Sequence, residues 1–255
     1  MLGFALLKHA LRMLVHNIPM TLRLTFLPYL LVVLLSMGIM SLLLPGWTQG
    51  IADAAGMIRT GEFQLKFALG LFAGFVGYVL ILSWSAIAWH RYVLLAEHPK
   101  SFLPPINQTL IWAYLGGALR VFLMTFLWGL LLVLLLSLLS YIFRPRPAIY
   151  LVLFTIGGIL ITSQILRYSL ILPAAALGTP MRLREATAAS KGRFPLFLFV
   201  AFVSWGISVL GDQAAQFLGW PFVLGLVFDW ISFAMGLSLL TTLYGLCVEG
   251  RSLDG

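Results

Sequence analysis

Apolar residues run through this chain in six long stretches, and Gly and Pro mark the connections between them. Each stretch holds about 20 residues with few charges, the length that a helix needs to cross the hydrocarbon core of a bilayer. A helix of that length satisfies all of its own backbone hydrogen bonds in lipid. We therefore predict an all-α membrane protein with six transmembrane helices, at residues 24–44, 67–89, 121–142, 149–172, 194–218 and 222–247.

The segment before the first stretch has two faces at helical spacing. Lys8, Arg12 and His16 repeat every four residues on one face. The opposite face is apolar and holds Phe4, Leu7, Leu11, Leu14 and Ile18. A helix with this pattern is expected to lie in the membrane interface.

Similar segments precede the third and fifth stretches. Residues 107–109 (Asn-Gln-Thr) are suited to cap a helix that runs through Arg120, and Met181–Gly192 places charged residues between Ala and Leu. We therefore divide the chain into three units, each a cytoplasmic surface helix followed by a transmembrane hairpin. All three belong to one integral membrane domain, residues 1–255. A local similarity between Trp89–Leu95 and Leu166–Leu172 agrees with such a repeat.

Composition supports a membrane protein and excludes a soluble globular domain. Of the 255 residues 61% are hydrophobic and 9% are charged, and the mean hydropathy is +1.02. The net charge of +8 does not indicate nucleic acid, because the basic residues stand singly between apolar runs. They are better explained as topology signals and headgroup contacts.

The distribution of Lys and Arg between the connections predicts the orientation, because cytoplasmic loops carry the excess. One side has ten such residues and the other has four, namely Arg59, Lys66, Arg144 and Arg146. Both termini are therefore expected in the cytoplasm. The N-terminus lacks the small-residue site of a cleaved signal peptide. The residues expected at headgroups or at the interface are Lys8, Arg12, Arg91, Arg120, Arg167, Arg182 and Arg184.

Two carboxylates, Asp212 and Asp229, fall within the fifth and sixth stretches, where charges are costly. They lie eight residues before and nine residues after Trp220, so a tight connection there places both at similar depth, about 12 Å from the helix ends. Together with Gln213 and Gln216 they would share a proton or hold a cation. The structural alternative, which we favour, is that Asp212 marks an early, wet helix end. Asp229 would then face water or pair with Arg144 or Arg146.

The second stretch carries small residues at Gly70, Ala73, Gly74 and Gly77. This spacing lets another helix approach closely. The face would serve partner binding or internal packing, and internal packing is the favoured use because a six-helix bundle needs close contacts of its own.

Residues for catalysis, metal binding or cofactor binding are not indicated. His90, Glu97 and His98 do not have the spacing of a zinc-binding helix. The single cysteine, Cys247, cannot form an intramolecular disulfide. Nucleophile elbows, P-loops and dinucleotide fingerprints are missing from the sequence. We therefore expect no metal, no cofactor and no enzymatic activity.

Three runs resemble segments of a known group of proteins. They are Ser83–Pro99, Leu166–Gly178 and Met181–Gly192. They look like parts of bacterial inner-membrane proteins of about six spans, related to the membrane domain beside glycerophosphodiester phosphodiesterases and to YciC-type integral membrane proteins. The resemblance implies a multi-pass protein of the bacterial inner membrane. It implies no phosphodiesterase activity, because no segment outside the six stretches is long enough for the soluble domain.

Two functions are compatible with these features. The first is a non-enzymatic accessory or scaffold protein that binds phospholipids or another membrane-protein complex, because polar groups are scarce within the stretches. The second is a small secondary transporter centred on Asp212 and Asp229. A role in lipid metabolism would rest only on analogy with the phosphodiesterase-linked relatives.

Overall fold

The computed structural model describes residues 2–43, 61–99, 103–143, 146–219 and 222–253, and every regular element in these ranges is a helix. Six helical segments are long and apolar enough to cross a membrane, which confirms the predicted number of candidate spans. The predicted connections at 44–47, 144–145 and 220–221 lie outside the described residues. The helices are α1 (Leu2–His16), α2 (Ile18–Thr21), the π-helix η1 (Leu22–Phe26), α3 (Leu27–Leu43), α5 (Gly61–Leu95), α6 (Gln108–Phe143), α7 (Pro147–Tyr168), α8 (Ile171–Ala176), α9 (Leu183–Ala189), α10 (Phe194–Leu218) and α11 (Phe222–Cys247).

The first span begins at Ile18, earlier than predicted, because α2 and η1 run directly into α3. Pro28 has no N–H, so the carbonyl of Leu24 four residues earlier loses its usual helical donor. The hydroxyl of Ser85 in α5 donates to this carbonyl at 2.6 Å. The irregular turn thus provides a buried polar contact between the first and second spans.

The predicted surface helix before the third span is not a separate element. Asn107 caps it as expected, since its side-chain oxygen accepts the N–H of Leu110 at 3.2 Å. From Gln108, however, α6 continues without a break for 36 residues to Phe143. Proline is absent from this stretch, and glycines such as Gly116 and Gly117 do not end a helix on their own.

The fourth candidate span, Ala148–Ala176, contains a helix break that was not predicted, since α7 ends at Tyr168. Pro173 cannot donate to the carbonyl of Ser169, which favours a break at this point. The short helix α8 then begins at Ile171, with Pro173 in its first turn, where a missing N–H is tolerated.

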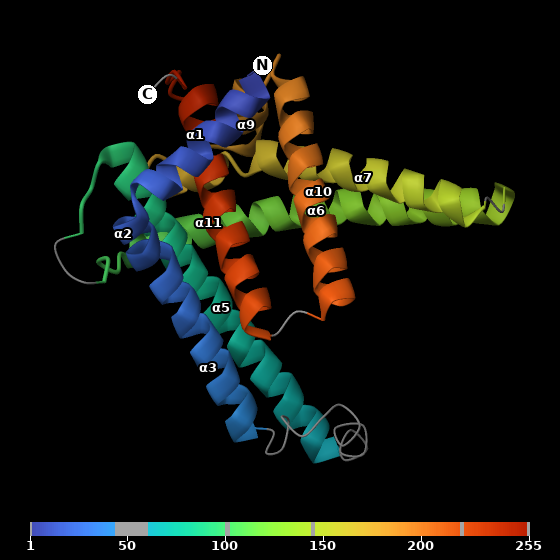
Figure 1. The fold of residues 1–255 in the computed structure, drawn as a ribbon, viewed down its shortest axis with the longest axis horizontal. Helices are drawn as coiled ribbons and strands as arrows, with labels where there is room; N and C mark the ends of the chain where they lie inside the picture. Colours follow the sequence, from blue (N-terminus) through green and yellow to red (C-terminus); the bar gives the residue numbers. More distant parts are fainter. Residues whose placement is uncertain (1, 44–60, 100–102, 144–145, 220–221, 254–255) are drawn as a thin grey trace.

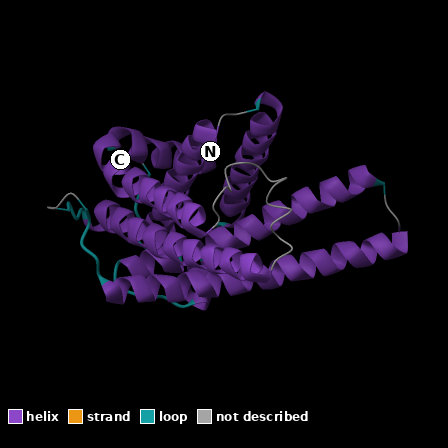
Figure 2. Ribbon diagram, turned by 90° about the horizontal axis from the view of Figure 1, so that it is seen from below, coloured by secondary structure: helices purple, strands orange, loops and turns teal. Residues whose placement is uncertain are grey.

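The long helices form two groups (Figures 1 and 2). α3 packs along α5, and α11 also contacts α5. α6 and α7 lie side by side and extend away from the other long helices; we call this pair the arm. α10 packs mainly against α7 and so joins the arm to the rest of the molecule.

Both chain ends lie at one end of the molecule (Figure 1). There α1 packs across α11, α8 contacts α5, α6 and α11, and α9 contacts α7. We call α1, α8, α9 and the helix ends that they cover the terminal layer. Its core is fully buried and includes Leu6, Leu170, Phe197 and Leu243.

Arginines hold the terminal layer together by capping helix ends. The last carbonyls of a helix lack intrahelical donors and carry partial negative charge. Arg91 donates to Ala176 O at 3.1 Å, Arg193 to Leu246 O at 2.5 Å and Arg251 to Leu94 O at 2.8 Å. Each contact joins the end of one helix, α8, α11 or α5, to a segment distant in sequence.

Candidate functional site

α1 is attached to the molecule along one side only. Three side chains at four-residue spacing, Leu6, Ala10 and Leu14, are buried and belong to the hydrophobic core. Its end is fixed by Asn17, whose amide donates to Met13 O at 2.9 Å and accepts the hydroxyl of Tyr92 at 2.7 Å. The helix is therefore held against α11 and α5 at a defined rotation.

A second apolar strip on α1 is largely exposed. Phe4, Leu11 and Val15 lie at helical spacing and are 60%, 53% and 52% exposed. The single apolar face predicted from the sequence is thus divided. Leu14 points into the core, while Phe4 and Leu11 point outward, and Ile18 belongs to α2.

The cationic strip of α1 borders this exposed apolar strip. Lys8 and Arg12 are exposed, and at 100° per residue they follow Leu11 and Val15 round the helix. An apolar strip edged by cations is the arrangement by which a helix inserts among acyl chains while its charges stay at the headgroups.

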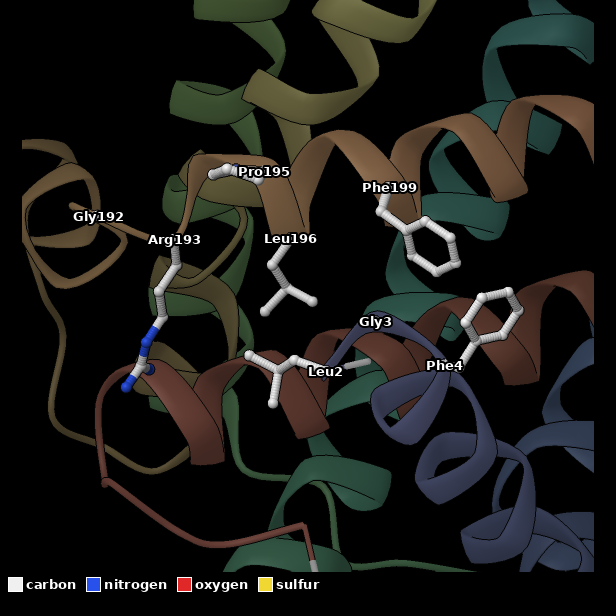
Figure 3. Close-up of a pocket in the computed structure, with 8 residues that line it drawn as sticks. All are labelled: Leu2, Gly3, Phe4, Gly192, Arg193, Pro195, Leu196 and Phe199. Carbon is white, nitrogen blue, oxygen red and sulfur yellow. The ribbon is translucent and has the colours of Figure 1, made fainter.

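An open pocket of about 330 Å³ adjoins the start of α1. It lies between the first turns of α1 and α10 and is lined mainly by apolar side chains, among them Leu2, Phe4, Leu196 and Phe199 (Figure 3). The rings of Phe4 and Phe199 are 4.9 Å apart at an angle of 60°. Arg193 edges the pocket, with its guanidinium turned toward the end of α11 that it caps.

The other predicted interface cations divide into two sets. Arg120, Arg182 and Arg184 are exposed. Arg91 and Arg167 are half-buried and bind protein groups: Arg167 donates to Ser190 Oγ at 3.0 Å and to Gln164 Oε1 at 3.1 Å. Its guanidinium also lies 5.7 Å from the centre of the Phe194 ring. Arg167 therefore positions the start of α10.

The predicted intramembrane polar residues lie on neighbouring parts of α10 and α11. Gly211 lies directly against the Phe228 ring, so closely that a Cβ at this position would collide with the ring carbons. Asp212 and Asp229, which follow these two residues, therefore lie at similar positions along the two helices. Both carboxylates are exposed, as are Gln213 and Gln216.

The surroundings of the two carboxylates differ. Asp229 interacts electrostatically with the Tyr29 hydroxyl of α3, whereas within the described residues Asp212 has no hydrogen-bond or ion-pair partner. The expected early helix end at Asp212 is wrong, because α10 continues to Leu218. Arg144 lies outside the described residues, and among those that are described no ion pair joins Asp229 to Arg146.

The small-residue face of α5 is used for internal packing at part of its length. Gly70 is buried, and a Cβ at Gly77 would lie 2.9 Å from Leu35 of α3. Gly74 has no atom within 4 Å of that position, and Ala73 is exposed. Gly77 thus belongs to the α3–α5 contact, whereas Ala73 lies outside it.

A buried polar pair that the sequence did not suggest joins α5 to α11. His90 is fully buried, and its Nδ1 lies 2.8 Å from Thr241 Oγ1. Because the Thr241 hydroxyl donates to Leu237 O at 2.7 Å, it accepts from His90. Five buried side-chain polar atoms within the described ranges have no partner: Trp84 Nε1, Trp89 Nε1, His90 Nε2, Tyr150 OH and Ser238 Oγ.

The polar pair left a weak signal in the sequence. Ser238, Thr241 and Thr242 cluster in the last half of a mainly apolar helix, which is typical of polar contact between membrane helices. The partner His90, 151 residues away, has no counterpart signal.

Metal-binding geometry does not occur in the part of the chain that the structure describes, since no three His, Cys, Asp or Glu side chains gather there. The chain matches no protein-family model, no curated protein sequence and no solved structure. The fold and the surface chemistry are therefore the basis for a function.

Proposed function

We propose that this chain is a non-enzymatic accessory protein of the bacterial inner membrane that binds phospholipid through its terminal layer, with both termini in the cytoplasm. The observation that carries the proposal is the division of α1 into a docked strip, an exposed apolar strip and a cationic strip. A helix needed only for folding would not keep Phe4, Leu11 and Val15 exposed beside Lys8 and Arg12.

Charge supports anionic phospholipid as the ligand class. With the proposed orientation, the exposed cations of α1 and α9 stand on the leaflet side where anionic lipids gather. The α1 helix itself contains no Asp or Glu. The pocket between Leu2, Phe4 and Phe199 would accept part of an acyl chain next to these cations.

Replacing both cations of the strip (Lys8→Gln with Arg12→Gln) should weaken retention of anionic phospholipid by about 30-fold, since each cation near an anionic surface contributes about 1 kcal/mol. The measurement is native mass spectrometry of protein in mild detergent, titrated with phosphatidylglycerol. Titration with phosphatidylcholine should give no difference between the variant and the original chain.

The control is Lys191→Gln, an exposed cation that lies outside α1. It removes one charge and should leave phosphatidylglycerol retention nearly unchanged. If each removed charge lowers phosphatidylglycerol retention equally at Lys191 and on α1, the effect depends on net charge alone. That result would refute a defined lipid-binding strip.

A second candidate function, a small secondary transporter, is favoured by the position of Asp212 and Asp229 on neighbouring parts of α10 and α11. It predicts proton flux through liposomes that contain the protein, followed with a pH-sensitive dye. Asp212→Asn with Asp229→Asn should abolish this flux, because the amides cannot release a proton. Proton flux that persists in the double variant would contradict the transporter function. Absence of proton flux with the original chain would contradict it as well.

Membership of the bacterial six-span group stays a prediction carried by Ser83–Pro99, Leu166–Gly178 and Met181–Gly192. The same holds for a membrane-protein complex as an additional partner. Co-purification from native membranes, with proteins and lipids both identified, would test for such a partner.

A further inference from the structure

A cleft of about 940 Å³ lies between the end of α5 and the start of α6, and none of its lining residues belongs to α1. One face of α5 forms its first wall, through Trp84, Ile87, Ala88 and Arg91 at helical spacing. Ile106, Asn107 and Ile111 belong to the second wall, and Glu97 and His98 come from the intervening loop. The volume is within the range of sites that hold small organic molecules.

The chemistry of the cleft changes along its length. Trp84, Ile87 and Ile111 make the inner part apolar, while Arg91 and Glu97 lie at the outer rim. Seven residues of helix, from Trp84 to Arg91, span about 10.5 Å. An amphiphile with a charged head and an apolar chain matches this change from polar to apolar.

The rim presents one positive and one negative charge side by side. Arg91 Nε donates to Glu97 Oε2 at 2.7 Å and its Nη2 to Glu97 Oε1 at 2.5 Å. Arg91 also donates to Ala176 O, which leaves two of its five N–H donors for a ligand. The Glu97 side chain is 49% exposed and keeps acceptor positions open.

The loop geometry that forms this rim is strained. Ala96 has φ = 52°, a left-handed conformation that side chains other than Gly adopt rarely. It reverses the chain directly after α5, so that Glu97 returns to Arg91, which precedes it by 6 residues. Backbone strain of this kind persists where the surrounding contacts hold it in place, and it is found most often at ligand sites.

We propose that the cleft binds a single phospholipid with a primary-ammonium headgroup, of the phosphatidylethanolamine type. Its phosphate takes the remaining donors of Arg91, its ammonium is accepted by Glu97, and an acyl chain lies against Trp84, Ile87 and Ile111. This inference goes beyond the proposed anionic-lipid contact of α1, and it rests on the proposed embedding of the chain in a phospholipid bilayer.

The test is native mass spectrometry of the full chain in mild detergent, titrated separately with phosphatidylethanolamine and phosphatidylcholine. We expect one phosphatidylethanolamine per chain, retained about tenfold more strongly than phosphatidylcholine, whose trimethylated nitrogen cannot donate hydrogen bonds to Glu97. Glu97→Gln should remove most of this preference. Equal retention of the two lipids by the original chain would overturn the proposal.

A second variant keeps the ion pair and fills the cleft. Ala88→Trp should abolish the tightly held lipid, whereas Ala73→Trp, on the exposed part of the same helix, should retain it. Full retention in the Ala88→Trp variant would place the lipid elsewhere and refute the cleft. The double variant Lys8→Gln with Arg12→Gln tests the α1 strip separately, with phosphatidylglycerol. It should leave the cleft lipid bound, so each of the two proposals can fail without the other.

Discussion

Gly158→Leu should destabilise the protein by about 3 kcal/mol, the largest loss that we expect from a single substitution. The reason is the close approach of α7 and α10: a Cβ at Gly158 would lie 2.5 Å from Trp205 Cη2. The Trp205 ring also contacts Phe154, with centroids 6.0 Å apart, and cannot shift without losing that contact. Unfolding in mixed micelles with increasing SDS, followed by far-UV circular dichroism, measures the loss.

The control for this substitution is Gly129→Leu in α6, where a Cβ would meet no atom within 4 Å. Leu has a better helix propensity than Gly, so this variant should be as stable as the original chain or slightly more stable. Combining Gly158→Leu with Trp205→Leu should recover part of the lost stability. Strict additivity of these two changes would contradict the proposed contact.

Thr241→Val should destabilise the protein by about 1–3 kcal/mol, because it leaves His90 Nδ1 buried without an acceptor. Valine keeps the shape of the threonine side chain, so the change removes little more than the hydroxyl. The same SDS titration measures this effect. Replacing both partners, His90→Phe with Thr241→Val, should cost less than the sum of the single changes, since no unpaired polar atom from the pair remains.

Thr242→Val is the matched control. Thr242 is also buried and donates to its own helix at Ser238 O, 2.8 Å away, but among the described residues it accepts from no other side chain. Its replacement should change the stability by less than about 1 kcal/mol. Similar losses at Thr241 and Thr242 would show that the hydrogen bond from His90 contributes nothing measurable.

The number and approximate limits of the spans were predictable, because length and hydropathy alone decide whether a helix can cross a bilayer. The fifth helix begins at Phe194 and the sixth ends at Cys247, as the sequence predicts. The errors occur where a local rule competes with a continuous apolar pattern. Pro28 and Pro173 shift helix register or end a helix, while the segment before Val121 simply continues as helix.

The chemistry of the surface was predictable in part. The stripe of Lys8 and Arg12 is visible at helical spacing, but its neighbour Leu14 is buried while Leu11 is exposed. Periodicity distinguishes polar from apolar faces, and it does not show which half of an apolar face meets protein and which half meets lipid.

Contacts between distant segments could not be predicted from the sequence. The capping of α11 by Arg193 and the pairing of His90 with Thr241 join residues 53 and 151 positions apart. Each depends on the tertiary arrangement, because one partner is a backbone carbonyl or a common hydroxyl with no pattern of its own. For the same reason the hydrogen bonds of Arg91 and Arg167 to protein atoms could not be predicted.

The arm has a mechanical consequence. α6 is anchored near Gly117, where Leu172 of the adjoining segment comes within 3.2 Å of a Cβ position, and from there to Phe143 the helix extends about 39 Å. A rotation of about 10° at this anchor moves the far end by about 7 Å. The short end of α6 borders the cleft that Ala88 and Ile111 line, so a change of angle at this end would be amplified at the far end of the arm.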